Sequence, residues 1–139
     1  MAKSVAYAND VLDDTLQNGA SGTYSVGPRT YTLPDRVVFL STVETDATPG
    51  TEWTGGGYPA GGVSLAGLVA TAAAAKSKAS TGAVTVTNAP ATTWADNRFQ
   101  DSTATPNRKV FKGAPSLAKT INAGDSASIP AGSLTANEA

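Results

Sequence analysis

Cysteine and histidine are both absent from the 139 residues. Without cysteine the chain has no disulfide framework, no thiolate nucleophile and no sulfur ligand for a metal. Without histidine, the Ser-His-Asp and Cys-His mechanisms and most zinc chemistry are excluded. An enzyme would have to work with carboxylates, lysines and hydroxyls alone. We therefore expect a protein that has no catalytic residues, no bound metal and no cofactor.

Charged residues are also scarce, at 15% of the chain against a typical value of about 25%. Ten Lys and Arg nearly balance eleven Asp and Glu, and no basic face stands out, so nucleic acid is not an expected partner. The longest apolar-rich run, residues 65–75, is shorter than the ~20 residues of a membrane span. No apolar core of a signal peptide precedes Asp10. We expect a soluble product, made in the cytoplasm of its host.

Residues 1–19 predict one helix. Ser4 can cap its first turn, and Gly19 favours its end. The apolar positions recur every three or four residues and form one stripe: Val5, Ala8, Leu12 and Leu16. The acidic positions are interpreted as a solvated outer face rather than a cation site: Asp10, Asp13 and Asp14.

The rest of the chain is typical of a β protein. Residues 30–33 alternate, residues 36–43 predict a buried core strand, and residues 83–89 predict a half-buried strand. Residues 62–69 form a further apolar run, and residues 44–57 predict a loop. Residues 70–82 fit a helix or a loop, and the loop is favoured.

The C-terminal third predicts further strands. Residues 108–121 predict one or two strands broken at Gly113 and Pro115. Residues 120–136 predict a hairpin that turns from Asn122 through Gly124 to Asp125, with Ile121 and Ile129 pointing inward. The fold class is therefore mainly β: a small antiparallel β-sandwich or barrel-like domain with one N-terminal α-helix. We expect a single domain over residues 1–139, with the helix in 1–19 and the β part in 30–136.

The segment TEWTGGGYPAGGVSL, residues 51–65, is either a ligand-cradling loop or the entry to a strand. A P-loop needs Gly-Lys-Ser/Thr before a helix, and a dinucleotide fingerprint needs G-x-G-x-x-G between a strand and a helix. Neither pattern is present. The structural interpretation is favoured, with Trp53 and Tyr58 as packing anchors. Gly55, Gly56 and Gly57 lie where a positive φ or a close backbone approach would cost least. A ligand cradle is the alternative.

Three polar groups are weaker candidates for chemistry. Ser77, Lys78 and Ser80 could form a Ser-Lys nucleophile pair, but the run is polar and we expect it to be exposed. Glu44 and Asp46 could bind calcium, yet the spacing of an EF-hand is missing. The third group, beside Trp94, is interpreted as a surface salt-bridge cluster rather than a catalytic carboxylate pair: Asp96, Arg98 and Asp101.

Four ordered motifs resemble a family of small tailed-bacteriophage virion proteins. The two longer ones are LSTVETDATPGTEWTGGGYPAGGVSL, residues 40–65, and LAKTINAGDSASIPAGSLTAN, residues 117–137. The shorter ones are ANDVLDDTL, residues 8–16, and AVTVTNAPATTW, residues 83–94. Together they cover most of the chain. The chain departs from the family pattern at Pro59, where an arginine is usual, and over RFQDSTATPNRKVF, residues 98–111.

The resemblance implies a virion structural protein without catalysis. Members are labelled tail-fibre proteins, and related small β proteins coat phage heads as capsid decoration or minor capsid proteins. Both locations stay open, with the decoration protein favoured and the tail-fibre or receptor-contacting protein as the alternative. We expect a homo-oligomer, with a trimer favoured, whose partners are the major capsid protein lattice or tail proteins. The N-terminal helix or the C-terminal SLTANEA, residues 133–139, is the expected lattice contact.

Overall fold

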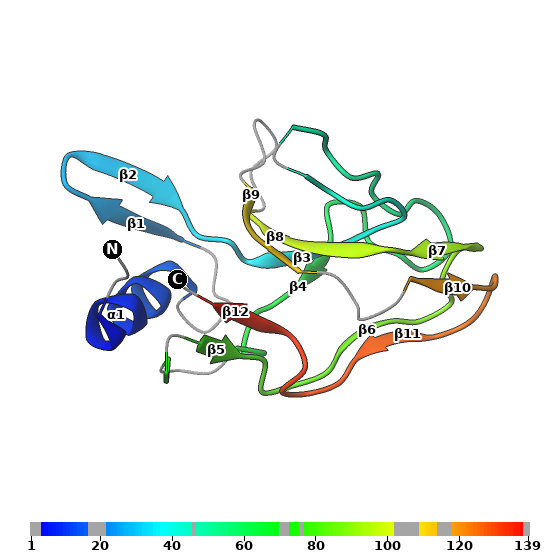
Figure 1. The fold of residues 1–139 in the computed structure, drawn as a ribbon. Helices are drawn as coiled ribbons and strands as arrows, with labels where there is room; N and C mark the ends of the chain where they lie inside the picture. Colours follow the sequence, from blue (N-terminus) through cyan, green and yellow to red (C-terminus); the bar gives the residue numbers. More distant parts are fainter. Residues whose placement is uncertain are drawn as a thin grey trace.

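A computed structural model describes residues 4–16, 22–45, 47–69, 73–75, 77–101, 109–113 and 118–137. The protein is mainly β, with antiparallel sheets and one short N-terminal helix (Figure 1). The fold class predicted from the sequence is confirmed. In Figure 1 a four-stranded sheet lies above a long two-stranded ribbon, and the helix lies at one end.

Helix α1 spans Val5–Leu16. Ser4 caps it as predicted, because its Oγ accepts a hydrogen bond from the Tyr7 amide at 3.2 Å. The buried stripe consists of Ala8, Leu12 and Leu16. Val5 was predicted to belong to it but is 51% exposed. Gly19 lies outside the described residues.

The larger sheet has the order β4-β3-β8-β9, and its neighbouring strands are antiparallel. The bounds of its strands are Val63–Ser64 for β4, Arg36–Leu40 for β3, Asp96–Gln100 for β8 and Lys109–Gly113 for β9. β3 is the core strand that the apolar run predicted, but it ends at Leu40 rather than at residue 43. β8 was not predicted, since its sequence DNRFQ is mostly polar although all five residues are buried.

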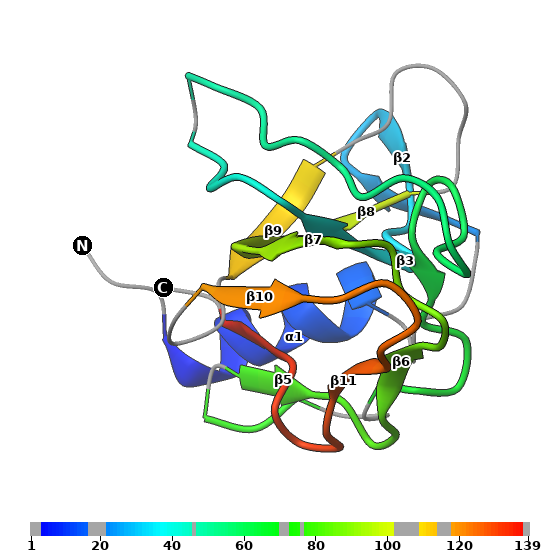
Figure 2. The same cartoon turned by 90° about the vertical axis from the view of Figure 1, so that its right-hand side faces the viewer.

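Three short strands along one segment pair with three along another to form the ribbon. The pairs are β5 (Ser77–Ala79) with β12 (Thr135–Asn137), β6 (Val84–Val86) with β11 (Ala127–Ile129), and β7 (Thr92–Trp94) with β10 (Lys119–Ile121). Backbone hydrogen bonds continue the pairing across the two interruptions, from Ser80 N to Leu134 O at 2.8 Å and from Ala89 N to Asp125 O at 2.7 Å. Residues 77–94 and 119–137 therefore form one antiparallel ribbon (Figure 2).

The ribbon corrects two predictions. Residues 70–82, favoured as a loop, contain β5, because residues 77–79 pair with residues 135–137, a distant partner that local propensity does not reveal. The turn at Asn122 and Asp125 exists, with Asp125 N bonded to Asn122 O at 3.1 Å. It is not a hairpin turn, since β10 and β11 on either side of it pair with β7 and β6 rather than with each other. β6 is half-buried, as the alternation of residues 83–89 predicted.

A separate hairpin joins β1 (Thr23–Val26) to β2 (Arg29–Thr32). β2 corresponds to the predicted alternation at residues 30–33. β1 was not predicted and precedes residue 30, where the β part was expected to begin. The turn uses Gly27 at φ 58°, a left-handed conformation that glycine adopts without steric cost.

One core joins the sheet, the ribbon and the helix. Its centre is aromatic: the Phe39 and Trp94 rings stack with centroids 4.9 Å apart, and the Trp53 ring meets Phe39 edge-on at 5.1 Å. The ribbon adds buried Ile129, as predicted, and Ile121 packs partly buried against the same cluster. Leucines of α1 complete the core at the other end.

Candidate functional site

The chain between β3 and β4 carries the glycine-rich segment and folds back along β3. We call residues 41–62 the β3–β4 connection. Its return is bonded to the edge of β3, from Ser41 N to Thr51 O at 2.8 Å and from Trp53 N to Phe39 O at 3.0 Å. This connection is the longest one next to β3. Its contacts therefore indicate whether the glycine-rich segment binds a ligand or supports the fold.

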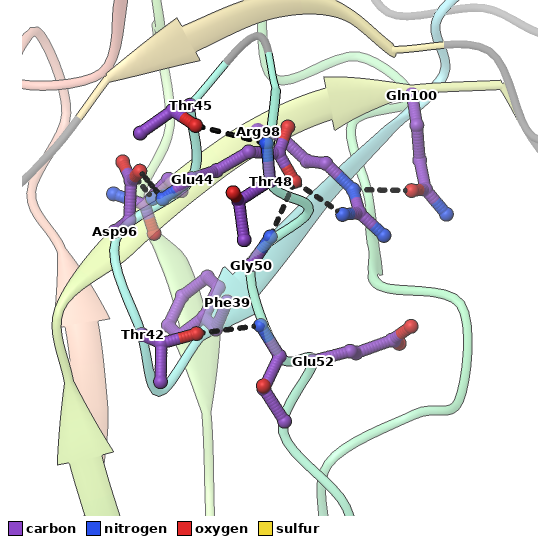
Figure 3. Close-up of polar contacts among 12 residues, drawn as sticks. Phe39, Thr42, Glu44, Thr45, Thr48, Gly50, Glu52, Asp96, Arg98 and Gln100 are labelled. Atoms are coloured by element: carbon purple, nitrogen blue, oxygen red, sulfur yellow. Dashed lines mark hydrogen bonds and ion pairs between the residues drawn. The ribbon is translucent and has the colours of Figure 1, made fainter.

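A buried ion pair joins the connection to the sheet (Figure 3). Arg98 of β8 donates from Nη1 to Glu44 Oε2 at 2.6 Å, and Nε donates to Gln100 Oε1 at 2.8 Å. The Gly50 amide donates to the same Glu44 oxygen at 3.1 Å. Glu44 therefore connects Arg98 of β8 to Gly50, and both ends of residues 44–50 are held at the sheet.

Arg98 was predicted to lie in a surface salt-bridge cluster, and that prediction is wrong. Asp96, Arg98 and Asp101 are all buried, because β8 is an inner strand covered by the β3–β4 connection. Asp96 Oδ2 accepts a hydrogen bond from the Glu44 amide at 2.8 Å and Oδ1 accepts one from the Asn97 amide at 2.8 Å. The Asp96 carboxylate thus holds the backbone amides of Glu44 and Asn97 in place.

The calcium interpretation of Glu44 and Asp46 gains no support. Glu44 is buried and faces Arg98, and a cation there would meet an arginine. Asp46 lies outside the described residues. Within the described parts of the chain, no group of three or more acidic residues is arranged to hold a metal ion.

Two glycines of the connection, Gly56 and Gly57, lie against the backbone of the ribbon. The Gly57 amide donates to Asn88 O at 2.6 Å, and a Cβ at Gly57 would overlap the carbonyl oxygen of Thr87. At Gly56, with φ at +56°, a Cβ would come within 2.5 Å of Asn88 O. Gly55, at φ +87°, faces open space. Gly56 and Gly57 allow a close approach of two backbones, and Gly55 supplies a left-handed φ, which supports the structural interpretation of the segment.

Trp53 and Tyr58 both pack into the core, as the sequence indicated. Trp53 Nε1 donates to Thr93 O at 3.0 Å. The Tyr58 hydroxyl donates to Glu52 Oε1 at 3.2 Å and accepts from the Phe39 amide at 3.3 Å. Burial, together with the negative charge of Glu52, raises the pKa of Tyr58 above its ordinary value of 10.0. Tyr58 is thus a protonated structural donor near neutral pH.

A second buried ion pair fixes helix α1 to the ribbon. Lys78 Nζ lies 3.1 Å from Asp13 Oδ1, and the Ala73 amide donates to the same oxygen at 2.7 Å. The Lys78 side chain is fully buried, so its predicted exposure is wrong. Of the three acidic residues predicted to lie on a solvated face, Asp10 and Asp14 are exposed, whereas Asp13 is only 37% exposed because its side chain faces Lys78 of β5.

The three residues of the Ser-Lys candidate also make structural contacts. Ser80 Oγ accepts from the Gly132 and Leu134 amides at 3.2 Å and 3.4 Å, and Lys78 pairs with Asp13. Ser77 belongs to β5 and lies opposite Asn137. Each group holds two segments of the ribbon or the helix together.

The remaining sequence candidates, Trp94, Gly124 and Asp125, belong to the ribbon. Lys119 Nζ lies 5.9 Å from the centroid of the Trp94 ring, within the range of a cation–π contact. Gly124 adopts φ +89°, and Asp125 Oδ2 accepts from the Asn122 amide at 3.0 Å. Gly124 and Asp125 shape a turn at one interruption of the ribbon.

Sequence reasoning missed the Glu44–Arg98 and Asp13–Lys78 pairs. Their partners are 54 and 65 residues apart, so no local spacing reveals them. One signal was available: Arg98 and Gln100 are two residues apart, which places them on one face of a strand. A polar face on a strand that also contains Phe99 indicates a covered polar layer.

A search of protein-family models, curated proteins and solved structures finds no match for this chain. None of the helical residues that the structure describes forms a helix long and apolar enough to cross a membrane.

Proposed function

We propose that the chain is a structural protein of a tailed-bacteriophage virion, and that it is a capsid decoration (minor capsid) protein which binds and stabilises the head surface. The observation that carries the proposal is the set of contacts that the residues of the resembling motifs make with one another. Trp53 and Gly57 belong to the motif at residues 40–65, and they pack or bond against the segment at residues 83–94, which is another motif. Tyr58 of the first motif packs against Trp53. The resemblance therefore falls on residues that define the fold.

The buried polar groups support a structural role. Lys78 and Arg98 are the side chains that an enzyme without histidine or cysteine would draw on, and each is paired with a carboxylate of another segment. Ser80 supports two amides of the ribbon. Side chains that a catalyst would expose to its substrate are used here to join segments of the fold, which suits a structural protein.

A tail-fibre or receptor-contacting protein is the second candidate. The β1–β2 hairpin extends away from the rest of the domain (Figure 1) and pairs its two strands from Thr23 and Thr32 to Val26 and Arg29. An extended hairpin is a shape that can reach a receptor. This hairpin is the feature that favours the tail.

Self-association is part of the proposal, with a trimer favoured. Several weak sites on one oligomer would engage a repeating lattice at once, so the oligomer binds an assembled capsid more tightly than it binds free subunits. Sedimentation of the purified protein measures the oligomer.

The test of the function is location. Cryo-electron microscopy of purified particles is expected to place the protein on the head, and the purified protein is expected to co-sediment with capsids stripped of it. Density at the tail tip, with no binding to stripped heads, would favour the tail-fibre alternative. Substrate turnover that is lost on changing Ser77, Lys78, Asp96 or Asp101 would overturn the structural role altogether.

A further inference from the structure

The β1–β2 hairpin is a sheet of two strands with both of its edges open. Neither β1 nor β2 pairs with another described strand, and Figure 1 shows the hairpin extending from the body of the domain at the left. A two-stranded hairpin by itself is marginally stable in water. An open strand edge also presents a row of backbone groups with which a further strand can pair. The hairpin is therefore incomplete as a sheet.

The register shows which backbone groups face outward. Leu33 N donates to Gly22 O at 2.8 Å, so residues 22 and 33 form a hydrogen-bonded pair. Bonded and non-bonded pairs alternate along an antiparallel ladder, and the residues of a non-bonded pair point their amide and carbonyl groups away from the hairpin. These outward-facing residues are Thr23 and Ser25 of β1, and Thr30 and Thr32 of β2. Among the described residues, no backbone hydrogen bond joins them to a segment outside the hairpin.

Neither edge carries the features that usually prevent pairing. Natural edge strands are commonly protected by lysine, by proline or by a bulge. The β1 sequence TYSV has no charged residue and no proline, and the β2 sequence RTYT has only Arg29, next to the turn. The register is continuous, without a bulge. Thr23, Ser25 and Thr30 are exposed and uncharged, so they allow a further strand to approach.

A second copy of the same hairpin fits these edges. Because β1 and β2 are antiparallel, the β2 edge of one copy runs antiparallel to the β1 edge of an equally oriented copy. Thr30 then lies opposite Ser25 of the second copy, which repeats a pair that the hairpin already makes internally, with the hydroxyl oxygens 3.3 Å apart. Arg29 again falls opposite the uncharged Val26, so the pairing places no like charges opposite each other.

We propose that the β1–β2 hairpin is the surface through which this protein self-associates, and that β2 of each copy pairs with β1 of the next in a ring of three. This names the surface of the oligomer and rests on the self-association in the proposed function. Head-to-tail contacts of this kind close into a ring when the rotation between copies fits. A ring pairs every edge, whereas a two-fold dimer leaves one edge of each hairpin open.

The first experiment blocks one edge at a time. Proline is tolerated in an edge strand where the N–H that it lacks would face outward, so Ser25→Pro blocks the β1 edge and Thr30→Pro the β2 edge without removing a bond of the hairpin. In analytical ultracentrifugation we expect a trimeric wild type, and for each variant a dissociation constant raised at least about tenfold. Ser25→Ala and Thr30→Ala keep the N–H and are expected to remain trimers. Wild-type association of both proline variants would overturn the proposal.

The second experiment mixes the two proline variants. Ser25→Pro keeps its β2 edge and Thr30→Pro keeps its β1 edge, so the mixture can form one interface but no ring. We expect the two monomers to combine into a one-to-one dimer. In a two-fold contact through one edge, one of the two variants would instead dimerise alone, and mixing would add nothing. That result would overturn the ring.

Hydrogen exchange examines the same edges in the unchanged protein. The amides of Thr23, Ser25 and Thr30 face solvent in a lone hairpin and are bonded in the ring. We expect these amides to exchange at least about tenfold more slowly in the oligomer than after dilution to the monomer. Exchange that does not depend on the oligomeric state would show that another surface joins the copies.

The outcomes also separate this proposal from the proposed function. A trimer that neither proline variant disrupts overturns the hairpin pairing and keeps the self-association. A monomeric wild type overturns both, and its binding to stripped heads then decides the decoration function by itself. Hairpin pairing without binding to stripped heads keeps the surface and overturns the decoration function.

Discussion

Gly57→Ala is the substitution that most directly tests how the glycine-rich segment works. At this position a methyl group would occupy the place of the Thr87 carbonyl oxygen. That oxygen belongs to the backbone of the ribbon, between β6 and β7, and cannot rotate aside as a side chain would. The β3–β4 connection must therefore move away from the ribbon, and the hydrogen bond from Gly57 N to Asn88 O, 2.6 Å long, is lost.

The magnitude follows from two contributions. Overpacking a tight contact costs about 1–3 kcal/mol, and losing a backbone hydrogen bond costs about 1 kcal/mol more. We expect the free energy of unfolding to fall by about 2–4 kcal/mol, which lowers the melting temperature of a domain of this size by roughly 6–15 °C. Urea unfolding followed by tryptophan fluorescence measures the free energy, since Trp53 and Trp94 are both in the core.

Gly82→Ala is the matched control. Gly82, like Gly57, has no left-handed φ, and its added Cβ would meet Leu68 Cδ2 at 2.6 Å. Here the obstacle is the end of a flexible side chain, which can change rotamer, so we expect a loss under about 1 kcal/mol. Both changes restrict the unfolded chain equally. If the two variants unfold at the same urea concentration, the close-approach argument for the triplet is wrong.

Three further predictions concern buried side chains. Trp53→Ala is expected to lower the free energy of unfolding by about 3–5 kcal/mol, and a wild-type melting curve would contradict its place in the core. Asp13→Ala should destabilise more than Lys78→Met, because the first leaves a fully buried ammonium unpaired whereas the second leaves a carboxylate that is 37% exposed; equal losses by urea unfolding would contradict this. Since the pKa of Tyr58 is raised in the folded state, the unfolded chain releases this proton first, and stability should fall as pH rises above about 10; Tyr58→Phe should remove that part of the decline, and an unchanged pH profile would refute it.

The sequence predicts the fold class because its signals are local. The cap at Ser4, the stripe from Ala8 to Leu16 and the apolar run of β3 each depend on neighbours in the chain. Trp53 and Tyr58 were recognised as anchors because large aromatics between glycines have few other uses. These positions were predicted without knowledge of the tertiary structure.

The ribbon and β8 could not be predicted in the same way. Whether Asn122 to Asp125 closes a hairpin or only interrupts a strand depends on the pairing partner, which lies in residues 77–94. The sequence DNRFQ looks exposed because four of its five side chains are charged or polar. Its burial follows from the β3–β4 connection, whose Glu44 supplies the charge that Arg98 needs.

The two buried ion pairs specify the arrangement of segments that the apolar core leaves undetermined. Only nine residues of the chain are aromatic, and the aliphatic core positions are mostly Val, Leu and Ala, which pack in more than one way at similar free energy. A buried charge must lie opposite its partner, because an unpaired buried charge is strongly destabilising. Glu44 opposite Arg98 fixes how the β3–β4 connection lies on the sheet, and Asp13 opposite Lys78 fixes how α1 lies along the ribbon. For the proposed decoration protein, which would present one surface to a repeating lattice, a unique arrangement would matter more than the last increment of stability.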